Sequence, residues 1–259
     1  MTLALPADWR QRLAQQLDVP PRAMRVPLFA GTARIGSVEP QLFRDSGIDA
    51  SLVREHDGAW HVHGDVTASL AAIADALRDI GVAHSWRDEQ LAVTDEAGRT
   101  VATVERAAVR VLGITTFAVH LAGMSPDGRH WVQQRAFTKA NDPGMWDTLV
   151  GGMIPASDSL EGALERETWE EAGLRMPQLQ QVAHAGRRLT RRPSRDYPAG
   201  YIVEWIDWYR CVVPHGARPS NRDGEVECFA LVDDAQLSQK LLGDEFTLEA
   251  MLVLSESAR

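Results

Sequence analysis

The sequence predicts an α+β protein of two units, a small α+β unit over residues 1–108 and an α/β sandwich over residues 109–259. In the first unit, short segments that alternate apolar and polar residues surround one helical stretch. In the second unit, longer apolar strand segments surround a central helix, and another helix ends the chain. A chain of 259 residues is long enough for two domains of ordinary size.

The first unit opens with an amphipathic helix over residues 7–17, where apolar residues recur at four-residue spacing. Thr67 is placed to cap a second helix that ends at Gly81. Strand segments are expected within 24–40, 59–64, 91–95 and 100–107. No Pro-, Gly- or Ser-rich linker follows, so we expect the two units to pack together.

The second unit opens with a long apolar strand over residues 109–123 and closes with a helix over residues 244–254. Further strands are expected at 130–135, 145–152, 200–213 and 225–232. The stretch 186–195 holds five arginines in ten residues. Because Pro193 and Ser194 favour irregular structure, we expect a mobile solvated loop there rather than a phosphate clamp.

Composition excludes several classes of protein. The net charge of −9 argues against a protein that coats nucleic acid or lies on a membrane. The first residues form no long apolar run, so we expect neither a signal peptide nor a membrane span. Two cysteines, Cys211 and Cys228, imply no disulfide framework. We expect a cytoplasmic protein with a small-molecule partner, and the sequence leaves a homodimer open.

Three carboxylates crowd the central helix that follows Gly152. Glu167, Glu170 and Glu171 are spaced i, i+3 and i+4, which places them on one helical face. Like charges at this spacing repel each other, and a divalent cation removes the repulsion. Hard oxygen ligands suit Mg²⁺ or Mn²⁺, which bind phosphate oxygens in turn. A solvated acidic surface is the plainer interpretation of the same pattern.

The ends of this helix carry recognisable signals. The D-S-L-E run at Asp158 has the pattern of a capping box, so the helix is expected to begin at Ser159. Gly173 supplies the C-terminal stop. Arg166 lies four residues before Glu170, where it can hold a carboxylate in one orientation.

The segment resembles the signature of Nudix hydrolases, G-x5-E-x7-R-E-U-x-E-E-x-G-U, where U is a bulky apolar residue. The matching positions are Gly152, Arg166, Glu167, Glu170, Glu171, Gly173 and Leu174. Two positions depart from it, because Asp158 replaces the first glutamate and Thr168 replaces the apolar residue. The resemblance implies a Nudix α/β/α sandwich with a mixed sheet, preceded here by a small α+β accessory domain.

By that resemblance, Glu170 and Glu171 are the principal ligands of Mg²⁺ or Mn²⁺. Glu167 is a ligand or orients the attacking water, and a backbone carbonyl near Gly151 or Gly152 completes the set. Such ions neutralise charge on a diphosphate and lower the pKa of water. The implied activity is hydrolysis of a diphosphate linked to an organic group. The signature residues implied in catalysis are Arg166, Glu167 and Glu170.

A further acidic residue is expected from outside the signature, because many members of the superfamily recruit one from a later loop as ligand or base. The candidates are Glu204, Glu225 and Glu227. The turn N-R-D-G-E-V-E-C-F resembles that region and favours Glu225 as the catalytic residue, followed by Glu227. Alternation along an exposed strand explains the same residues equally well.

Residues 137–153, F-T-K-A-N-D-P-G-M-W-D-T-L-V-G-G-M, resemble a Nudix branch associated with thiamine pyrophosphokinase in fungi. Members of that branch carry an N-terminal accessory domain, which would match residues 1–108. The implied substrate is thiamine diphosphate, or its oxidised forms, cleaved to the monophosphate and phosphate. Lys139 and Arg135 are then candidates to contact phosphate, and Trp146 to stack on a ring. A surface lysine and a core tryptophan are the alternatives.

Other functions remain open beside this one. A nucleotide-directed Nudix enzyme would act on a nucleoside triphosphate or an ADP-sugar. A catalytically silent Nudix module would bind a ligand or partner, although it has no need for a charge-repelling helix. Relatives of isopentenyl diphosphate isomerase need a catalytic cysteine near the metal, whereas Cys211 and Cys228 lie late in the chain.

Overall fold

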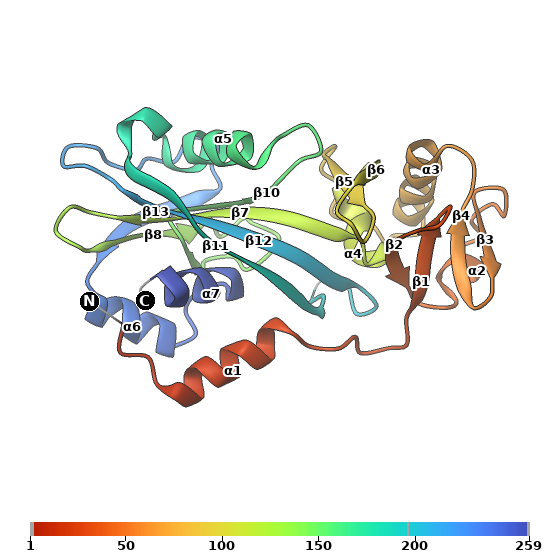
Figure 1. The fold of residues 1–259 in the computed structure, drawn as a ribbon, viewed down its shortest axis with the longest axis horizontal. Coiled ribbons are helices and arrows are strands. Elements are labelled where there is room, and N and C mark those ends of the chain that lie inside the picture. The colour runs from red at the N-terminus through yellow and green to blue at the C-terminus, as the bar shows by residue number, and fades with distance from the viewer. Residues whose placement is uncertain (1–2, 196, 258–259) are drawn as a thin grey trace.

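We describe a computed structural model of the chain, in which residues 3–195 and 197–257 are placed. A four-stranded sheet lies at one end of the long axis and a seven-stranded sheet at the other, with a two-stranded hairpin between them (Figure 1). The predicted α+β architecture, a small unit followed by a larger mixed-sheet unit, is confirmed.

The first unit is a small sheet covered by one long helix. Its strands lie in the order β2-β1-β4-β3, with β1 and β4 parallel. They are β1 (Val26–Ala30), β2 (Ala33–Val38), β3 (Val53–His56) and β4 (Ala59–Val62). The helices are α2 (Leu42–Asp45) and α3 (Val66–Asp79), and α3 buries Leu70, Ile73 and Leu77 in the core. Apolar residues three and four apart form that buried face.

The start of α3 differs from the prediction. Asp65, not Thr67, caps it, because the Asp65 carboxylate accepts a hydrogen bond from the Ala68 N–H at 2.9 Å. The Thr67 hydroxyl instead accepts a bond from the Thr103 N–H at 3.3 Å. An aspartate in extended backbone reaches the third residue of the helix in the usual manner of an N-cap.

The predicted strand 109–123 is wrong in its first part. After the hairpin of β5 (Gln90–Thr94) and β6 (Thr100–Glu105), the chain forms the 3-10 turn η1 (Arg106–Ala108) and helix α4 (Val109–Leu112). Gly113 ends α4 in the left-handed region with φ 55°, and strand β7 (Thr115–Met124) begins only after it. The apolar side chains of α4 pack in the core of the first unit. An apolar run alone cannot separate a buried helix from a buried strand.

The second unit is built on a seven-stranded mixed sheet. Its main strand order is β11-β12-β7-β8-β13, with β12 parallel to β7, while β10 pairs with β7 and β9 with β8. The remaining strands are β8 (His130–Arg135), β9 (Trp146–Asp147), β10 (Val150–Met153), β11 (Gln180–Pro193), β12 (Tyr201–Val212) and β13 (Val226–Val232). Helix α5 (Leu160–Ala172) covers one face (Figure 1). Helices α6 (Asp234–Leu242) and α7 (Leu248–Ser257) cover the other. This is the α/β/α sandwich.

The strand predicted over residues 145–152 is interrupted. It divides into β9 and β10 at Thr148, which is fully buried. The Thr148 N–H donates to the Asp147 side chain at 2.8 Å, and its hydroxyl donates to the Val150 carbonyl at 2.7 Å. These local side-chain hydrogen bonds replace backbone hydrogen bonds between strands, and the chain changes its pairing partner from β8 to β7 at this point.

The arginine-rich stretch 186–195 is not the predicted solvated loop, because most of it belongs to the edge strand β11. Arg187 lies over the ring of Trp205 at 4.6 Å, Arg191 pairs with Asp18, and Arg192 pairs with Glu249. Each of these three charges therefore has a partner. Charged side chains also protect a sheet edge from pairing with another chain.

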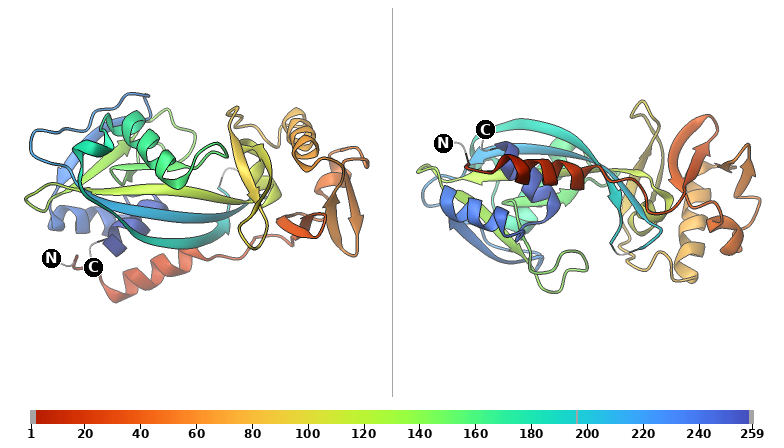
Figure 2. Two further views of the ribbon diagram at one scale, coloured as in Figure 1. Left: turned by 45° about the horizontal axis from the view of Figure 1, so that its top comes forward. Right: turned by 90° about the horizontal axis from the view of Figure 1, so that it is seen from below.

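Helix α1 (Ala7–Leu17) has the predicted bounds but packs on the second unit. Its buried Trp9, Leu13 and Leu17 join the core under α7, and Figure 2 shows α1 beside α7. The last helix begins at Leu248 rather than residue 244, and α6 before it was not predicted. The division at residue 108 stays a prediction. No helix in the described part of the chain is long and apolar enough to cross a membrane.

Candidate active site

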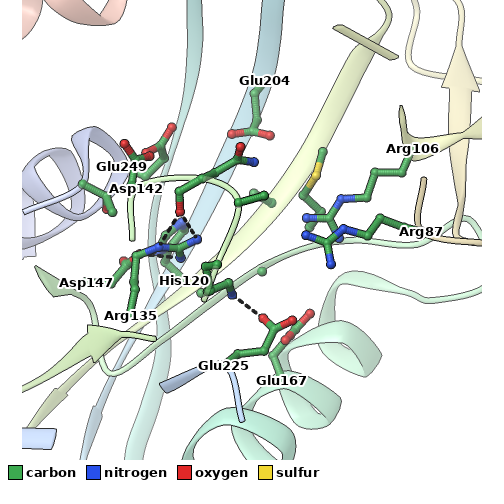
Figure 3. A pocket seen from close by; sticks show the side chains of 18 of the residues that line it. Arg87, Arg106, His120, Arg135, Asp142, Asp147, Glu167, Glu204, Glu225 and Glu249 are labelled. Carbon is green, nitrogen blue, oxygen red and sulfur yellow. Dashed lines mark hydrogen bonds and ion pairs between the residues drawn. The ribbon is translucent and has the colours of Figure 1, made fainter. Parts of the chain in front are cut away.

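A pocket of about 320 Å³ lies where the two units meet (Figure 3). Its walls come from β10 and α5, from the loop after β8, from the turn before β13, and from the first unit. Of the site residues predicted from the sequence, those that line it are Arg135, Lys139, Gly152, Arg166, Glu167, Glu170 and Glu225. The fold therefore brings together side chains that are up to 90 positions apart in the sequence.

Ser159 is the N-cap of α5, the helix that carries the three glutamates. The Ser159 hydroxyl, not Asp158, caps α5 by accepting a hydrogen bond from the Gly162 N–H at 3.0 Å. Gly173 ends the helix in the left-handed region with φ 62°, as predicted. The predicted cap Asp158 is free for another task, and it accepts a bond from Arg166 at 2.9 Å.

Arg166 ties the acidic face together. Its guanidinium lies 3.0 Å from a Glu167 oxygen and 2.8 Å from a Glu170 oxygen, besides its bond to Asp158. Burial lowers the pKa of Arg166, but these three carboxylates outweigh it, so the pKa is raised and the guanidinium stays charged. Arg166 thus orients the carboxylates, as its spacing predicted, and Asp158 provides part of its support.

Glu171 lies behind the pocket rather than in its lining. It is 1% exposed and accepts hydrogen bonds from the Gln133 amide at 2.9 Å and the Gly151 N–H at 3.0 Å. Burial, followed by repulsion from Glu167, raises the pKa of Glu171 to about 8, although Lys139 opposes the shift. Glu171 therefore connects α5 to β10 and to β8.

Glu167 packs directly against the glycine that opens the signature. A Cβ added to Gly152 would overlap the Glu167 carboxylate, so only glycine allows this approach. Burial raises the pKa of Glu167 to about 7, with Glu170 and Glu225 adding to the shift and Arg166 opposing it. The carboxylates of Glu167 and Glu171 are thus short of the positive charge that would keep them ionised.

The donors in this corner fit a hard divalent cation in type and charge. Carboxylate oxygens and a backbone carbonyl near Gly152 are the ligands that Mg²⁺ prefers. In the conformation described, the glutamates turn to Arg166, Gln133 and the backbone. Within the described residues, no group of three or more His, Cys, Asp or Glu side chains is arranged around one metal position. A cation would therefore have to replace Arg166 as the partner of Glu167 and Glu170.

Lys139 and Glu225 form an ion pair in the pocket lining, and Figure 3 shows Glu225 beside Glu167. Burial raises the pKa of Glu225, but the hydrogen bond and charge of Lys139 outweigh it and hold the pKa below its usual value. Lys139 also lies 3.9 Å from a Glu171 oxygen. Of the other acidic candidates, Glu227 is exposed outside the pocket and Glu204 lies in its lining, bonded to Thr116 at 2.9 Å.

The domain model described as "NUDIX domain" matches residues 115–250, just over half of the chain. This chain belongs to the Nudix family. The match begins at the first residue of β7 and extends into α7, and it contains the whole signature.

Two curated relatives illustrate the range of similar proteins. Nudix hydrolase 20, chloroplastic, from Arabidopsis thaliana is 30% identical over 70% of this chain and 49% of that protein. Isopentenyl-diphosphate Delta-isomerase from Streptomyces coelicolor is 31% identical over 63% of this chain and 81% of that protein. The chain thus spans about half the length of the Arabidopsis relative.

A solved structure shares the fold. The crystal structure of DR0079 from Deinococcus radiodurans aligns over 66% of this chain and 98% of that one, with a TM-score of 0.51 and 19% identity. This likeness supports the mixed-sheet sandwich of the Nudix unit and nothing about its chemistry.

Two residues predicted to bind substrate have other partners. Trp146 does not line the pocket between the two units. Its ring lies 4.5 Å from the Lys240 ammonium and packs against the core beneath β8, as the core-packing alternative has it. Arg135 lines the pocket, but its guanidinium bonds to the Asn141 carbonyl at 3.0 Å and lies 3.4 Å from Asp147. Arg135 therefore holds the loop that carries Lys139.

Several other residues line the pocket, and of these only Glu204 is among the candidates named from the sequence. A group of polar residues at its far end comes from β7, β11, β12 and α7, and it consists of His120, Arg192, Glu204 and Glu249. Arg87, Glu89, Arg106 and Arg110 come from the first unit and from α4. Isolated charged residues between apolar segments are typical of any surface, so only the fold shows that they meet here.

Proposed function

We propose that this chain is a metal-dependent Nudix hydrolase that cleaves a diphosphate linked to an organic group. The observation that carries the proposal is the single pocket in which the signature helix, Lys139 and Glu225 converge. Binding alone would not require two buried carboxylates such as Glu167 and Glu171, whose pKa values are raised first by burial and then by repulsion from neighbouring glutamates. A hydrolase that binds a divalent cation and an anionic substrate does require them.

Mg²⁺ or Mn²⁺ is the proposed cofactor, with Glu167, Glu170 and the carbonyl of Gly152 as its ligands and Glu171 behind them. The ion would supply charge neutralisation for the diphosphate and would acidify water. Arg166 would release its two glutamates to the ion while it keeps its bond to Asp158. The ionised carboxylates then gain a partner of higher charge in a site with little solvent.

The side chains divide the remaining tasks. Glu225 is ionised at neutral pH and lines the pocket beside Glu167, where it can accept a proton from water. Lys139 pairs with Glu225 and can move to a phosphate oxygen whose charge grows during cleavage. Arg135 fixes the loop on which Lys139 stands.

Thiamine diphosphate, or an oxidised form of it, is the proposed substrate. The proposal rests on the resemblance of residues 137–153 to the thiamine-associated branch. Asp142, Glu204 and Glu249 lie at the end away from Glu167 (Figure 3). A cationic ring at that end would compete with Arg195 for Asp142 and with Arg192 for Glu249. No Phe, Tyr or Trp is among the described residues that line the pocket, so stacking is not part of the proposal.

Isomerisation of isopentenyl diphosphate is the second candidate, favoured by the similarity to the Streptomyces isomerase. The cysteines oppose it. Cys211 is buried in the core beneath α5, and burial raises the pKa of its thiol to about 12. Cys228 is exposed and contacts Gln134 at 3.6 Å. Neither lines the pocket where such a catalytic cysteine would be needed.

A substrate screen tests the proposal. The full-length protein with Mg²⁺ is offered thiamine diphosphate, oxidised thiamine diphosphate, ADP-ribose, nucleoside triphosphates and isopentenyl diphosphate. Phosphate or nucleotide release and isomer formation are measured. Release of phosphate from a thiamine compound is expected. Turnover of nucleotides alone would reject the thiamine assignment but keep the hydrolase, and binding without any turnover would favour the silent module.

A further inference from the structure

The first unit contributes one wall of the pocket. Arg87 and Arg106 flank the hairpin of β5 and β6, and both line the pocket opposite the glutamate helix. Figure 3 shows the two side chains reaching into the pocket from the side of the first unit, with Glu167 and Glu225 across from them. Neither arginine belongs to the Nudix signature or to the matched domain.

This wall is held in place by a buried acid. Glu105 is 2% exposed, and its carboxylate accepts hydrogen bonds from the N–H groups of Arg87 at 3.0 Å and Glu89 at 3.1 Å. The loop before α5 is bonded to the same hairpin, because the Ala156 N–H donates to the Gln90 carbonyl at 2.8 Å. The backbones that carry the arginines and the glutamate helix are therefore fixed relative to each other.

The two guanidinium groups differ in what they already bind. Arg106 pairs with Glu89 at 2.6 Å. The Arg87 side chain is exposed, and among residues 3–195 and 197–257 it has no hydrogen bond or ion pair. The charges of both arginines nevertheless help to lower the pKa of Glu225 on the opposite wall. A cation without a partner, facing a carboxylate-lined pocket, is placed to receive an anion.

We propose that Arg87 and Arg106 bind the terminal phosphate of the substrate, so that the first unit completes the diphosphate site. Guanidinium groups match phosphate oxygens in geometry and keep their charge at any physiological pH. They would balance the acidic side of the pocket, which otherwise repels the substrate. The inference rests on the proposed function for the chemical class of substrate, but the site can be tested without turnover.

The probe is inorganic pyrophosphate with Mg²⁺, and its binding to the full-length protein is measured by calorimetry. Arg87→Gln and Arg106→Gln should each weaken binding by about 10- to 100-fold, the loss expected for one charge-assisted hydrogen bond. Arg99→Gln is the matched control, because Arg99 lies in the turn of the same hairpin, paired with Asp95 and outside the pocket. It should bind like the wild type.

A gain of affinity provides a second readout that misfolding cannot imitate. Glu89→Gln frees Arg106 and removes a negative charge from the pocket, so it should tighten pyrophosphate binding about two- to fivefold. In kinetic assays with the substrate found by the screen, Arg87→Gln should raise KM more than it lowers kcat, as loss of a binding contact does.

The outcomes separate this inference from the proposed function. If no diphosphate is hydrolysed but pyrophosphate binding depends on both arginines, the hydrolase proposal fails and the site stands. If hydrolysis proceeds and both variants keep the wild-type KM and pyrophosphate affinity, the site is refuted while the hydrolase stands. Failure of the wild type to bind pyrophosphate, or a loss in only one of the two arginine variants, also refutes the joint site.

Discussion

Gly152→Ala should disable the site while leaving the fold intact. The added Cβ would lie 2.9 Å from Glu167 Oε2 and closer still to the rest of the carboxylate, whereas ordinary contact begins at 3.4 Å. The obstacle is the far end of a flexible side chain, so Glu167 can retreat at little cost in stability. A retreat of about 1 Å moves a proposed metal ligand out of position, and such a displacement costs about 100-fold in rate.

Three measurements decide this prediction: kcat, the affinity for Mg²⁺ or Mn²⁺ by calorimetry, and the thermal midpoint. We expect kcat to fall about 100-fold, metal affinity to weaken, and the midpoint to shift by no more than a few degrees. Gly162→Ala is the control, since its Cβ would meet only the Ser159 hydroxyl at 3.3 Å. Wild-type turnover and metal affinity in Gly152→Ala would refute the role of Glu167, and a collapse of stability would refute the steric reasoning.

The other predictions concern charge and capping. Glu170→Gln should lower kcat by about 100-fold or more and weaken metal binding with the fold retained; unchanged kinetics would contradict the metal assignment. The pKa of Glu171 rises from 4.5 in the unfolded chain to about 8 in the fold, so its contribution to stability falls as the pH rises between these values. Glu171→Gln should therefore stabilise the metal-free protein at pH 9. The free energy of unfolding, measured in a thermal or urea melt, should rise by at least about 1.4 kcal/mol, the value of one pKa unit. An unchanged free energy of unfolding would show that the carboxyl is not desolvated. Lys139→Met should raise the pKa of Glu225, which moves the acidic limb of the pH–rate profile to higher pH; an unmoved limb would remove Glu225 as the base. Asp65→Ala removes the cap of α3 and should cost about 1 kcal/mol in unfolding experiments, whereas the predicted cap Thr67 should matter less.

The elements that were predicted correctly are those with local causes. Helix α1 follows from apolar residues at four-residue spacing, and the end of α5 follows from Gly173, which adopts a left-handed conformation that few other residues tolerate. The errors arose where local signals compete. Asp158 and Ser159 are both good caps, and the structure uses the serine because Arg166 engages the aspartate.

Long-range packing explains the larger errors. In the sequence, the arginine-rich residues 186–195 resemble a solvated loop. In the fold, three of these arginines contact Trp205, Asp18 and Glu249, which belong to other parts of the chain. Residues 109–112 have the apolar pattern of a buried strand. They form a helix, and their apolar side chains pack in the core of the first unit. Helix α1 belongs to the first 108 residues of the chain yet packs on the second unit. None of these partners is near in sequence.

The signature helix and the family could be read directly from the residue order, because ligand spacing on one helical face and glycines at both ends are local properties of the chain. The fold alone placed Lys139 against Glu225, put Glu171 behind the pocket and removed Trp146 from it. It also set Arg87 and Arg106 across from the glutamates. Those contacts join residues dozens of positions apart, and their distances depend on how sheets and loops pack, which no local pattern of residue types encodes.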